Sequence, residues 1–486
     1  MNITLIAGAR PNFMKIAPLI KAIEKYNEQK VESGKSRVES QEWKGESQEI
    51  SYRLVHTGQH YDKNMSDTFF EELGIPAPDT NLGCGGGTQA EQTAAIMVAF
   101  EKELIAHPAD IVLVVGDVTS TMACSIVAKK LNTRVCHVEA GIRSWDLSMP
   151  EEINRMVTDS LADYMFTTSE VANRNLQRMG AELKASPKSS PEGKDFYEPT
   201  SNIHLKGGGG DGLNSLPFRE EQEVGLAEDK YAYERVPQRV WYVGNVMIDT
   251  LLANRARFRQ PEVWNTLALQ EKQYIVMTMH RPANVDEENH LRAMMEQIVD
   301  NAHGLPIVFP IHPRTAKLFY NLWKPTPSPV YGRSDAPRCS SRSDCQAEAI
   351  LHLKGREECT VYGVECKEGE ELAKRFPNLH IVEPLGYLEF NYLVERAKAV
   401  VTDSGGITEE TTVMGVPCIT LRDNTERPET CTVGTNELIG TKPEAIKPAL
   451  DKLFAGEWKK GGVPALWDGH TAERIIAILA GLDVRC

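Results

Sequence analysis

The chain repeats one local pattern along most of its length, a short run of β-branched and apolar residues followed by a helix-length segment with apolar residues at helical spacing. This alternation is typical of βαβ units, in which helices cover both faces of a parallel sheet. The expected strands are Ile3–Ala7, Tyr52–His56, Ile111–Val115, Arg134–Val138, Tyr164–Thr167, Val240–Val243, Tyr274–Met279, Ile307–Ile311, His380–Glu383, Ala399–Thr402 and Pro417–Leu421. A chain of 486 residues is too long for one core, so the pattern predicts an α/β protein with two Rossmann-like, doubly wound parallel-sheet domains facing a cleft.

We expect an N-terminal Rossmann-like domain over residues 1–182 and a C-terminal nucleotide-binding domain over residues 237–468. Three segments lack the apolar density for cores of their own, and we interpret them as surface insertions, at about 29–49, 183–236 and about 325–369. Residues 469–486 should form a helix that packs back on the N-terminal domain. The last insertion carries cysteines at spacings that do not match the usual zinc pairs, so no metal is expected: Cys339, Cys345, Cys359 and Cys366.

The composition of the chain limits the partners that it can bind and the cellular compartment in which it can act. The longest apolar runs, such as Ile111–Val115, are far shorter than the roughly 18 residues of a membrane span, and the N-terminus lacks the order of a signal peptide. Ten cysteines are spread along the chain without a disulfide framework, as is typical of reduced thiols. The net charge of −14 disfavours nucleic acid, because binding a phosphate backbone requires a basic surface. We therefore expect a cytoplasmic protein with neither a membrane nor a nucleic-acid partner.

The clearest ligand-binding feature is Val400–Pro417, where an apolar strand runs into Asp403-Ser404-Gly405-Gly406 and then into a helix. Two glycines let the backbone approach an anion, and the free N–H groups and positive dipole end of the helix attract it. A plain strand-to-helix turn, with glycines needed only for packing, is the alternative. Cationic residues elsewhere favour a phosphate site, since Arg10 and Lys15 follow the first strand and Arg427 lies beyond the last.

Carboxylates lie just past two neighbouring strands of the predicted N-terminal domain. Asp117 follows one strand, Glu139 follows the next, and Glu151 lies farther along the same loop. Carboxylates crowded into one cleft raise each other's pKa, which provides a general acid and a general base near neutral pH. Asp117 could instead cap the next helix, and Glu151 could simply belong to the acidic first turn of a helix that begins at Pro150.

In the C-terminal domain one strand ends at His280-Arg281 and another at His312-Pro313-Arg314. A histidine beside an arginine suits a diphosphate, and His280 should share its sheet edge with Ser404, whereas we interpret His312 as structural. Cations and helix ends on one side of a cleft, with carboxylates on the other, suit an activated sugar whose diphosphate faces the cations. Neither GxGxxG after the first strand nor a GxxxxGKS or GxxxxGKT loop is present, which disfavours nicotinamide and ATP chemistry.

Several longer motifs resemble those of the non-hydrolysing UDP-N-acetylglucosamine 2-epimerases, which have the glycosyltransferase-B fold. They span nearly the whole chain apart from the insertions: GARPNFMKIAPL, HTGQHYD, VVGD, HVEAGIRSWDLSMPEEINR, GNVMID, TMHRPANVD and TDSGGITEETTVMGVPCITLRDNTERPE. The resemblance implies reversible inversion of carbon 2, from UDP-N-acetylglucosamine to UDP-N-acetylmannosamine, by anti elimination of UDP to a glycal and re-addition of UDP.

The resemblance also implies roles for individual residues. Carried over by motif, the catalytic set would be Asp117, Glu139, Glu151 and His280. The substrate-binding set would be Arg10, Lys15, Arg143, Leu385, Phe390, Ser404, Gly405, Gly406, Glu410 and Arg427. A UDP-sugar substrate, a homodimer and the absence of any cofactor or metal are implied as well.

Several other functions are compatible with the same motifs. The chain reads TGQHYD where most bacterial members have TGQHREM, so the allosteric substrate site described for the family is not implied here. Members with the same catalytic frame act on UDP-2,3-diacetamido uronic acids, which leaves the sugar undecided. A hydrolysing 2-epimerase, a glycosyltransferase on the same fold and a non-catalytic nucleotide-sugar sensor are the further alternatives.

Overall fold

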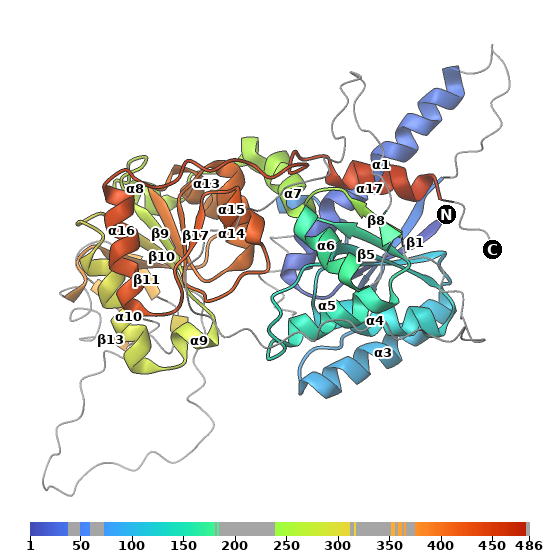
Figure 1. Cartoon of the computed structure of the whole chain (residues 1–486), viewed down its shortest axis with the longest axis horizontal. Helices are drawn as coiled ribbons and strands as arrows, with labels where there is room; N and C mark the ends of the chain where they lie inside the picture. The colour runs from blue at the N-terminus through green and yellow to red at the C-terminus, as the bar shows by residue number, and fades with distance from the viewer. Residues whose placement is uncertain are drawn as a thin grey trace, which may run out of the picture.

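The computed structural model describes residues 1–36, 49–58, 72–179, 182–183, 239–311, 315–316, 351–354, 358–361, 364–365 and 375–482. Two parallel β-sheets, each with helices on both faces, form two lobes that lie side by side (Figure 1). We call the lobe built on the first sheet the N-lobe and the other the C-lobe. The predicted class of two Rossmann-like α/β domains is confirmed.

The N-lobe is built on an eight-stranded parallel sheet with the order β3-β2-β1-β4-β5-β6-β8-β7. Its strands are β1 (Asn2–Ala7), β2 (Ser51–His56), β3 (Thr80–Asn81), β4 (Ile111–Val115), β5 (Arg134–Ala140), β6 (Tyr164–Thr167), β7 (Glu182–Leu183) and β8 (Arg239–Tyr242). Its helices are α1 (Arg10–Ser36), α3 (Gln89–Ala106), α4 (Thr119–Lys130), α5 (Pro150–Leu161) and α6 (Glu170–Arg178). The strand order reverses between β1 and β4, and ligands of open α/β sheets bind at such a reversal.

Strand β4 shows why this sheet needs continuous apolar runs. All of its residues are buried, with Ile111, Leu113 and Val115 packed in the core under α1, and Val112 and Val114 packed in the core under α3 and α4. Because helices cover both faces of the sheet, alternate residues of β4 enter different cores and both sets are apolar.

The C-lobe is built on a six-stranded parallel sheet with the order β14-β10-β9-β15-β16-β17. Its strands are β9 (Ile275–Thr278), β10 (Ile307–Pro310), β14 (Leu379–Val382), β15 (Ala399–Thr402), β16 (Cys418–Thr420) and β17 (Asn436–Leu438). The surrounding helices are α8 (Glu262–Thr266), α9 (Pro282–Val285), α10 (Glu288–Asp300), α13 (Tyr387–Arg396), α14 (Gly405–Met414), α15 (Pro428–Thr432), η2 (Pro443–Ala445) and α16 (Ile446–Phe454). Here the strand order reverses between β9 and β15, which places the second ligand-binding edge at their carboxyl ends.

Strand β8 corrects the expected domain boundary. We expected the C-terminal domain to begin at residue 237, but Arg239–Tyr242 pairs in parallel with β6 and so completes the N-lobe sheet. The chain crosses to the C-lobe after this strand, through α7 (Val246–Asn254) and η1 (Arg255–Arg257). Helix α7 packs on both α1 and α14, and it lies between the lobes (Figure 1).

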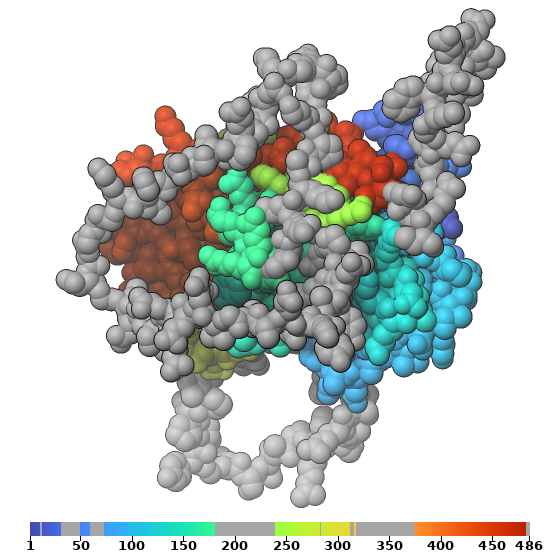
Figure 2. Space-filling view, turned by 45° about the vertical axis from the view of Figure 1, so that its right-hand side comes forward, coloured from blue at the N-terminus to red at the C-terminus, as the bar shows by residue number. Residues whose placement is uncertain are grey.

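The last helix, α17 (Thr471–Ala480), returns to the N-lobe, as expected. Its residues Ala472, Ile475 and Leu479 are buried in the same core as Ile3. The carboxylate of Asp249 caps this helix by accepting the backbone N–H groups of its first two residues at 3.1 and 2.7 Å. Figure 2 shows the red residues of α17 next to the blue residues of α1.

Most of the three predicted insertions lies outside the described residues, as do His312, Cys339, Cys345 and Cys366. In the third insertion, β11 (Leu351–Lys354), β12 (Glu358–Val361) and β13 (Val364–Glu365) form a small antiparallel sheet. Within the described residues, none of the helices is long and apolar enough to cross a membrane. The same residues contain no group of three or more His, Cys, Asp or Glu side chains placed to hold a metal ion.

Candidate active site

The predicted site residues come from strand ends of both lobes, as the two strand-order reversals require. Asp117 follows β4 and Glu139 is the next-to-last residue of β5 in the N-lobe, while His280 and Ser404 follow β9 and β15 in the C-lobe. Arg427 lies beyond β16 and connects the two lobes, because its Nη2 donates to Glu139 Oε2 at 3.1 Å. The structure therefore brings the two halves of the predicted site together.

Glu139 lies at a register shift in the pairing of β5 with β6, between Val138 and Ala140. Its φ of +71° is in the left-handed region, which non-glycine residues seldom adopt and which here turns the side chain out of the sheet. Glu139 Oε2 accepts a hydrogen bond from Lys15 Nζ at 2.6 Å in addition to that from Arg427. Glu139 Oε1 is buried and has no hydrogen-bond partner among the described residues.

Gly116 makes the contact between Lys15 and Glu139 possible. A Cβ at this position would lie 3.0 Å from Lys15 Nζ and 3.6 Å from Glu139 Oε2, and the φ of +69° also favours glycine. A side chain at residue 116 would therefore push the ammonium group away from the carboxylate.

Arg427 is held by carboxylates from both lobes. Its Nε donates to Glu409 Oε1, which also accepts Asn245 Nδ2 at 3.0 Å. Burial alone would lower the pKa of Arg427, but the charges of Glu409 and Glu139 outweigh burial and raise it. We predicted Lys15 and Arg427 as cations for the substrate diphosphate. In this structure Lys15 pairs with Glu139, and Arg427 pairs with Glu139 and Glu409.

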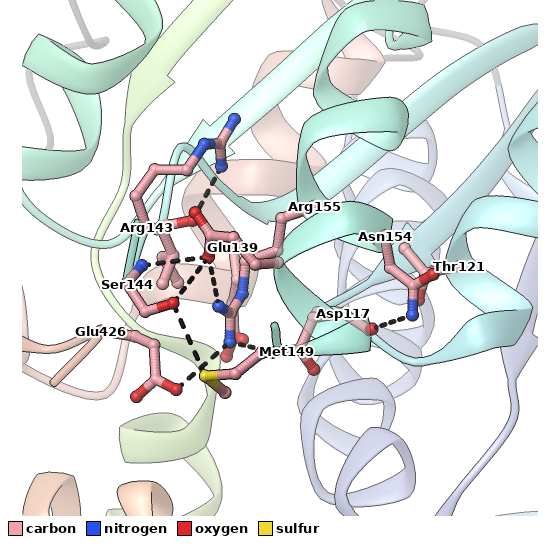
Figure 3. A network of polar contacts seen from close by, with 12 residues as sticks. Asp117, Thr121, Glu139, Arg143, Ser144, Met149, Asn154, Arg155 and Glu426 are labelled. Carbon is pink, nitrogen blue, oxygen red and sulfur yellow. Dashed lines mark hydrogen bonds and ion pairs between the residues drawn. The ribbon is translucent and has the colours of Figure 1, made fainter. Parts of the chain in front are cut away.

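Asp117 is bound by a second interlobe network, centred on Arg155 of α5 (Figure 3). Arg155 Nη2 donates to Asp117 Oδ2, and its Nη1 donates to Glu152 Oε2 at 2.8 Å. From the C-lobe, Glu426 Oε1 approaches the same Nη2 to 3.6 Å. Asn154 Nδ2 also donates to the backbone carbonyl of Asp117 at 2.8 Å, so hydrogen bonds hold both the backbone and the side chain of Asp117.

The electrostatics of this network keep Asp117 ionised. Burial alone would raise the pKa of the Asp117 carboxyl, but the charges of Arg155 and Lys15 outweigh burial and hold the pKa below its usual value. The side chain is 30% exposed, so a substrate can reach it. The alternative role as a helix cap does not apply, because the N-cap of α4 is Val118. Asp117 is thus an accessible carboxylate that is ionised at neutral pH.

His280 is positioned by a buried aspartate that we had not included among the site residues. Asp403 Oδ2 accepts the backbone N–H groups of His280 and Arg281 at 2.9 and 2.8 Å, and Asp403 Oδ1 lies 2.9 Å from His280 Nδ1. Burial would raise the pKa of Asp403, but the hydrogen bonds from His280 outweigh it and lower the pKa. The His280 side chain is 51% exposed, so its other edge faces outward.

The N-terminus of α14 supplies the predicted anion-binding feature. Its N-cap, Ser404, makes no side-chain capping hydrogen bond, and the first turn holds no acidic residue. Arg422 Nη1 would lie 3.5 Å from a Cβ at Gly405, so a cation stands beside this turn. Arg281, 31% exposed, lies on the same side, with its Nη2 3.8 Å from Glu426 Oε1. Open N–H groups and nearby guanidinium groups suit an anionic ligand.

The negative charge of Glu426 offsets the positive charges of Arg422, Arg281 and Arg155. Burial would raise its pKa, but the hydrogen bonds and charge of Arg422, together with the charge of Arg155, lower it to about 2. Glu151 is exposed in the first turn of α5, and its charge acts on Arg281 across the gap. The pKa of Arg281 is lowered, first by burial and then by Arg422, while the carboxylates around it oppose this shift.

The remaining predicted residues fall in different places. Arg10 begins α1, but its side chain is not among those described. Arg143 is fully buried and donates to Asp159 Oδ2 at 2.6 Å, so in this structure it supports the loop after β5 and does not reach the gap. Leu385 precedes α13 and Phe390 lies on it, and both are partly buried against the C-lobe core. A substrate contact for Arg143 stays a prediction, and this arrangement does not favour it.

Glu410 lies on α14 and is 4% exposed. Its Oε1 accepts the hydroxyl of Tyr387 at 2.9 Å. Burial raises the pKa of Glu410 from its ordinary 4.5 to about 7, and the hydrogen bond from Tyr387 offsets only part of this effect. At neutral pH this carboxyl is therefore close to half ionised before any ligand binds.

We expect Glu410→Gln to stabilise the ligand-free protein at pH 8 by up to about 3 kcal/mol, because ionising a carboxyl whose folded pKa is raised costs folding energy. The folded state binds this proton more tightly than the unfolded state, so the wild type loses stability as the pH rises from 4.5 to about 7. The gain should therefore fall below about 1 kcal/mol at pH 5, as urea unfolding at both pH values would measure. An equal gain at pH 5 and pH 8 would show that ionisation is not the cause.

Comparisons with known proteins all point to one family. The sequence profile described as UDP-N-acetylglucosamine 2-epimerase matches residues 44–185 and 227–480. The UDP-N-acetylglucosamine 2-epimerase of Methanocaldococcus jannaschii is 31% identical over 489 residues, covering 99% of each chain. The UDP-2,3-diacetamido-2,3-dideoxy-D-glucuronate 2-epimerase of Pseudomonas aeruginosa is 30% identical, covering 99% of this chain and 100% of that relative.

A solved structure agrees with these relatives. The crystal structure of the Methanocaldococcus jannaschii enzyme in complex with UDP-GlcNAc and UDP matches this fold with a TM-score of 0.67 at 30% identity, covering 99% of each chain. The profile match alone extends over more than half of the residues. With strand-end carboxylates in one lobe, an open helix N-terminus in the other and these relatives, the chain belongs to the UDP-N-acetylglucosamine 2-epimerase family.

Proposed function

We propose that this protein interconverts UDP-N-acetylglucosamine and UDP-N-acetylmannosamine without a cofactor, by eliminating UDP and adding it back. The observation that carries the proposal is that the strand ends of the two lobes meet. Asp117 and Glu139 lie at the strand ends of the N-lobe, and the open N-terminus of α14 with His280 lies at those of the C-lobe. The relatives named above support the same assignment.

The diphosphate would bind at the C-lobe edge. The N–H groups at Gly405 and Gly406 and the exposed edge of His280 can donate to phosphate oxygens, and Arg281 adds positive charge. Uridine would extend toward Leu385, Phe390 and Glu410 on the same lobe. This placement leaves the sugar ring directed at Asp117 and Glu139 in the N-lobe.

The chemistry follows from the acidity of carbon 2. Its hydrogen is only weakly acidic, so breakage of the bond between carbon 1 and the UDP oxygen must lead, with the diphosphate taking the electron pair. We propose that the ionised Asp117 accepts the carbon 2 proton, which leaves a double bond between carbons 1 and 2. Return of a proton to the opposite face of carbon 2, with re-addition of the UDP oxygen to carbon 1, completes the inversion.

The second proton donor would be one of two glutamates. Glu139 has a buried oxygen without a partner among the described residues, but its other oxygen is held by two cations. Glu151 is exposed on α5 and faces Arg281 across the gap. We propose Glu151 as the group that exchanges the proton on the second face and Glu139 as the group that orients the ring.

We also propose that the protein acts as a homodimer in the cytoplasm. Large apolar side chains stand exposed on two helices of the N-lobe, and a second copy could cover them. They are Val98 and Ile105 on α3, and Ile153 and Met156 on α5. Their exposed fractions range from 37% to 62%, which is high for side chains of this size.

Proton NMR in heavy water tests the function. Purified protein incubated with UDP-N-acetylglucosamine is expected to produce UDP-N-acetylmannosamine, with deuterium replacing the carbon 2 proton in both nucleotide sugars. A protein that acts on UDP-2,3-diacetamido uronic acid would show the same exchange only with that sugar. Free N-acetylmannosamine with UDP would identify a hydrolysing enzyme, and UDP release only in the presence of an acceptor would identify a transferase. Any of these three outcomes would contradict the proposal.

A further inference from the structure

A contact between the lobes fixes the start of α13, the helix that carries Phe390. Glu72 of the N-lobe accepts the backbone N–H of Tyr387 at 3.1 Å through Oε2, and its Oε1 lies 3.2 Å from Arg259 Nη2. The side chain of Glu72 is only 9% exposed. The N-cap of α13 is Gly386, which has no side chain to cap the helix. A carboxylate from the opposite lobe therefore supplies the negative charge that this N-terminus attracts.

Gly386 leaves the room that this contact needs. A Cβ at Gly386 would lie 2.8 Å from Glu72 Oε1, so any other residue there would displace the carboxylate. Apolar packing accompanies the polar contact, because Leu73 is buried in the same core as Tyr387 and Leu388. The first turn of α13 is thus embedded in the N-lobe although the rest of the helix belongs to the C-lobe.

Tyr387 connects this contact to the predicted nucleoside site. Its hydroxyl donates to Glu410 Oε1 at 2.9 Å, and burial together with Glu410 raises the pKa of Tyr387 well above its usual value, so the hydroxyl stays a donor. Leu385 and Phe390 flank Tyr387 in sequence, and Phe390 N donates to Gly386 O at 2.9 Å. A displacement of Tyr387 would therefore move the groups predicted to hold uridine.

We propose that Glu72 is a positioning residue for nucleoside recognition. It holds the N-terminus of α13 from the opposite lobe and, through Tyr387, sets the position of Glu410 and of residues 385–390. The inference rests on the proposed function, because it assigns this pocket to the uridine of the substrate. Its consequence is that affinity for uridine, but not affinity for the diphosphate, depends on the contact between the lobes.

Calorimetric titration with UDP and with inorganic pyrophosphate tests this assignment. Glu72→Ala is expected to weaken UDP binding about tenfold, as the loss of a helix cap would. Glu72→Gln keeps an acceptor but loses the charge, and should weaken UDP binding about threefold. Pyrophosphate binding should stay within about twofold of wild type in both variants, and turnover should show a raised KM with kcat unchanged.

Two further variants make the test specific. Asp249→Asn alters a buried carboxylate that caps α17 and should leave UDP binding unchanged. Tyr387→Phe should weaken UDP binding by itself, and its effect combined with Glu72→Ala should be smaller than the product of the two, because both act through one residue. If Glu72→Ala does not fold, Glu72→Gln and Tyr387→Phe decide the outcome.

The inference would be overturned by equal losses of UDP and pyrophosphate binding, or by unchanged UDP binding in a folded Glu72→Ala protein. Failure of the wild-type protein to bind UDP would instead contradict the proposed function, because the pocket would then have been assigned to the wrong ligand.

Discussion

Asp117→Asn is expected to lower kcat by about 10³-fold, the size of effect seen when a positioned general base is lost. The amide keeps the shape of the side chain and can still contact Arg155, but it cannot accept the carbon 2 proton. UDP affinity should stay within about threefold of wild type, because we propose that the diphosphate binds at the other lobe. Turnover measured by the loss of the carbon 2 proton signal in heavy water, with UDP binding measured by calorimetry, checks both values.

Glu152→Gln is the matched control for this variant. Glu152 also accepts a hydrogen bond from Arg155, but it is fully buried and holds the backbone N–H of Ser144 at 3.0 Å, so it does not reach the substrate. We expect it to retain at least a tenth of wild-type kcat. Parallel losses of UDP binding and turnover in Asp117→Asn would contradict the assignment of Asp117 to the chemical step.

Arg427→Met should have the largest effect on stability, lowering the free energy of unfolding by about 3 to 5 kcal/mol. The guanidinium is buried between Glu139 and Glu409, and its loss leaves carboxylates buried with fewer partners. Turnover should also fall below detection, since Glu139 loses the contact that ties it to the C-lobe. Urea unfolding of the ligand-free protein, followed by the heavy-water assay, measures the two effects.

The double variant Arg427→Met with Glu409→Gln separates these two effects. The second substitution removes the negative charge of Glu409, which the loss of Arg427 would otherwise leave buried without its ion-pair partner. The double variant should therefore recover part of the lost stability while turnover stays absent. Lys447→Met breaks an exposed pair with Asp451 and should change stability by no more than about 0.5 kcal/mol. A change below about 1 kcal/mol in Arg427→Met would show that this buried network does not stabilise the fold as we infer.

The sequence predicted the strands that are buried on both faces, because those strands are rich in apolar residues. Ile111–Val115 and Ala399–Thr402 were found with the predicted bounds. In the two parallel sheets, the strands that we did not predict are β3, β7 and β17, which are two or three residues long and lie at sheet edges, where no continuous apolar run is needed. The assignment of β8 to the C-lobe was wrong because a local pattern shows a strand but not the sheet that it joins.

The sequence also indicated which residues gather at the site, because the carboxyl ends of parallel strands meet at one edge. It did not indicate how their charges pair. We expected Lys15 and Arg427 to be free for a diphosphate, yet each is bound to a carboxylate in this structure. Arg155 and Glu426 stand inside the matching motifs, but their burial and mutual approach arise from packing of the two lobes, which no local pattern contains.

The pairing of Arg427 with Glu139 across the lobes has a consequence for motion of one lobe against the other. Parting the lobes would break this ion pair and let water reach both charged groups, and their hydration would offset part of the lost attraction. A contact of this kind can therefore hold the lobes together without locking them.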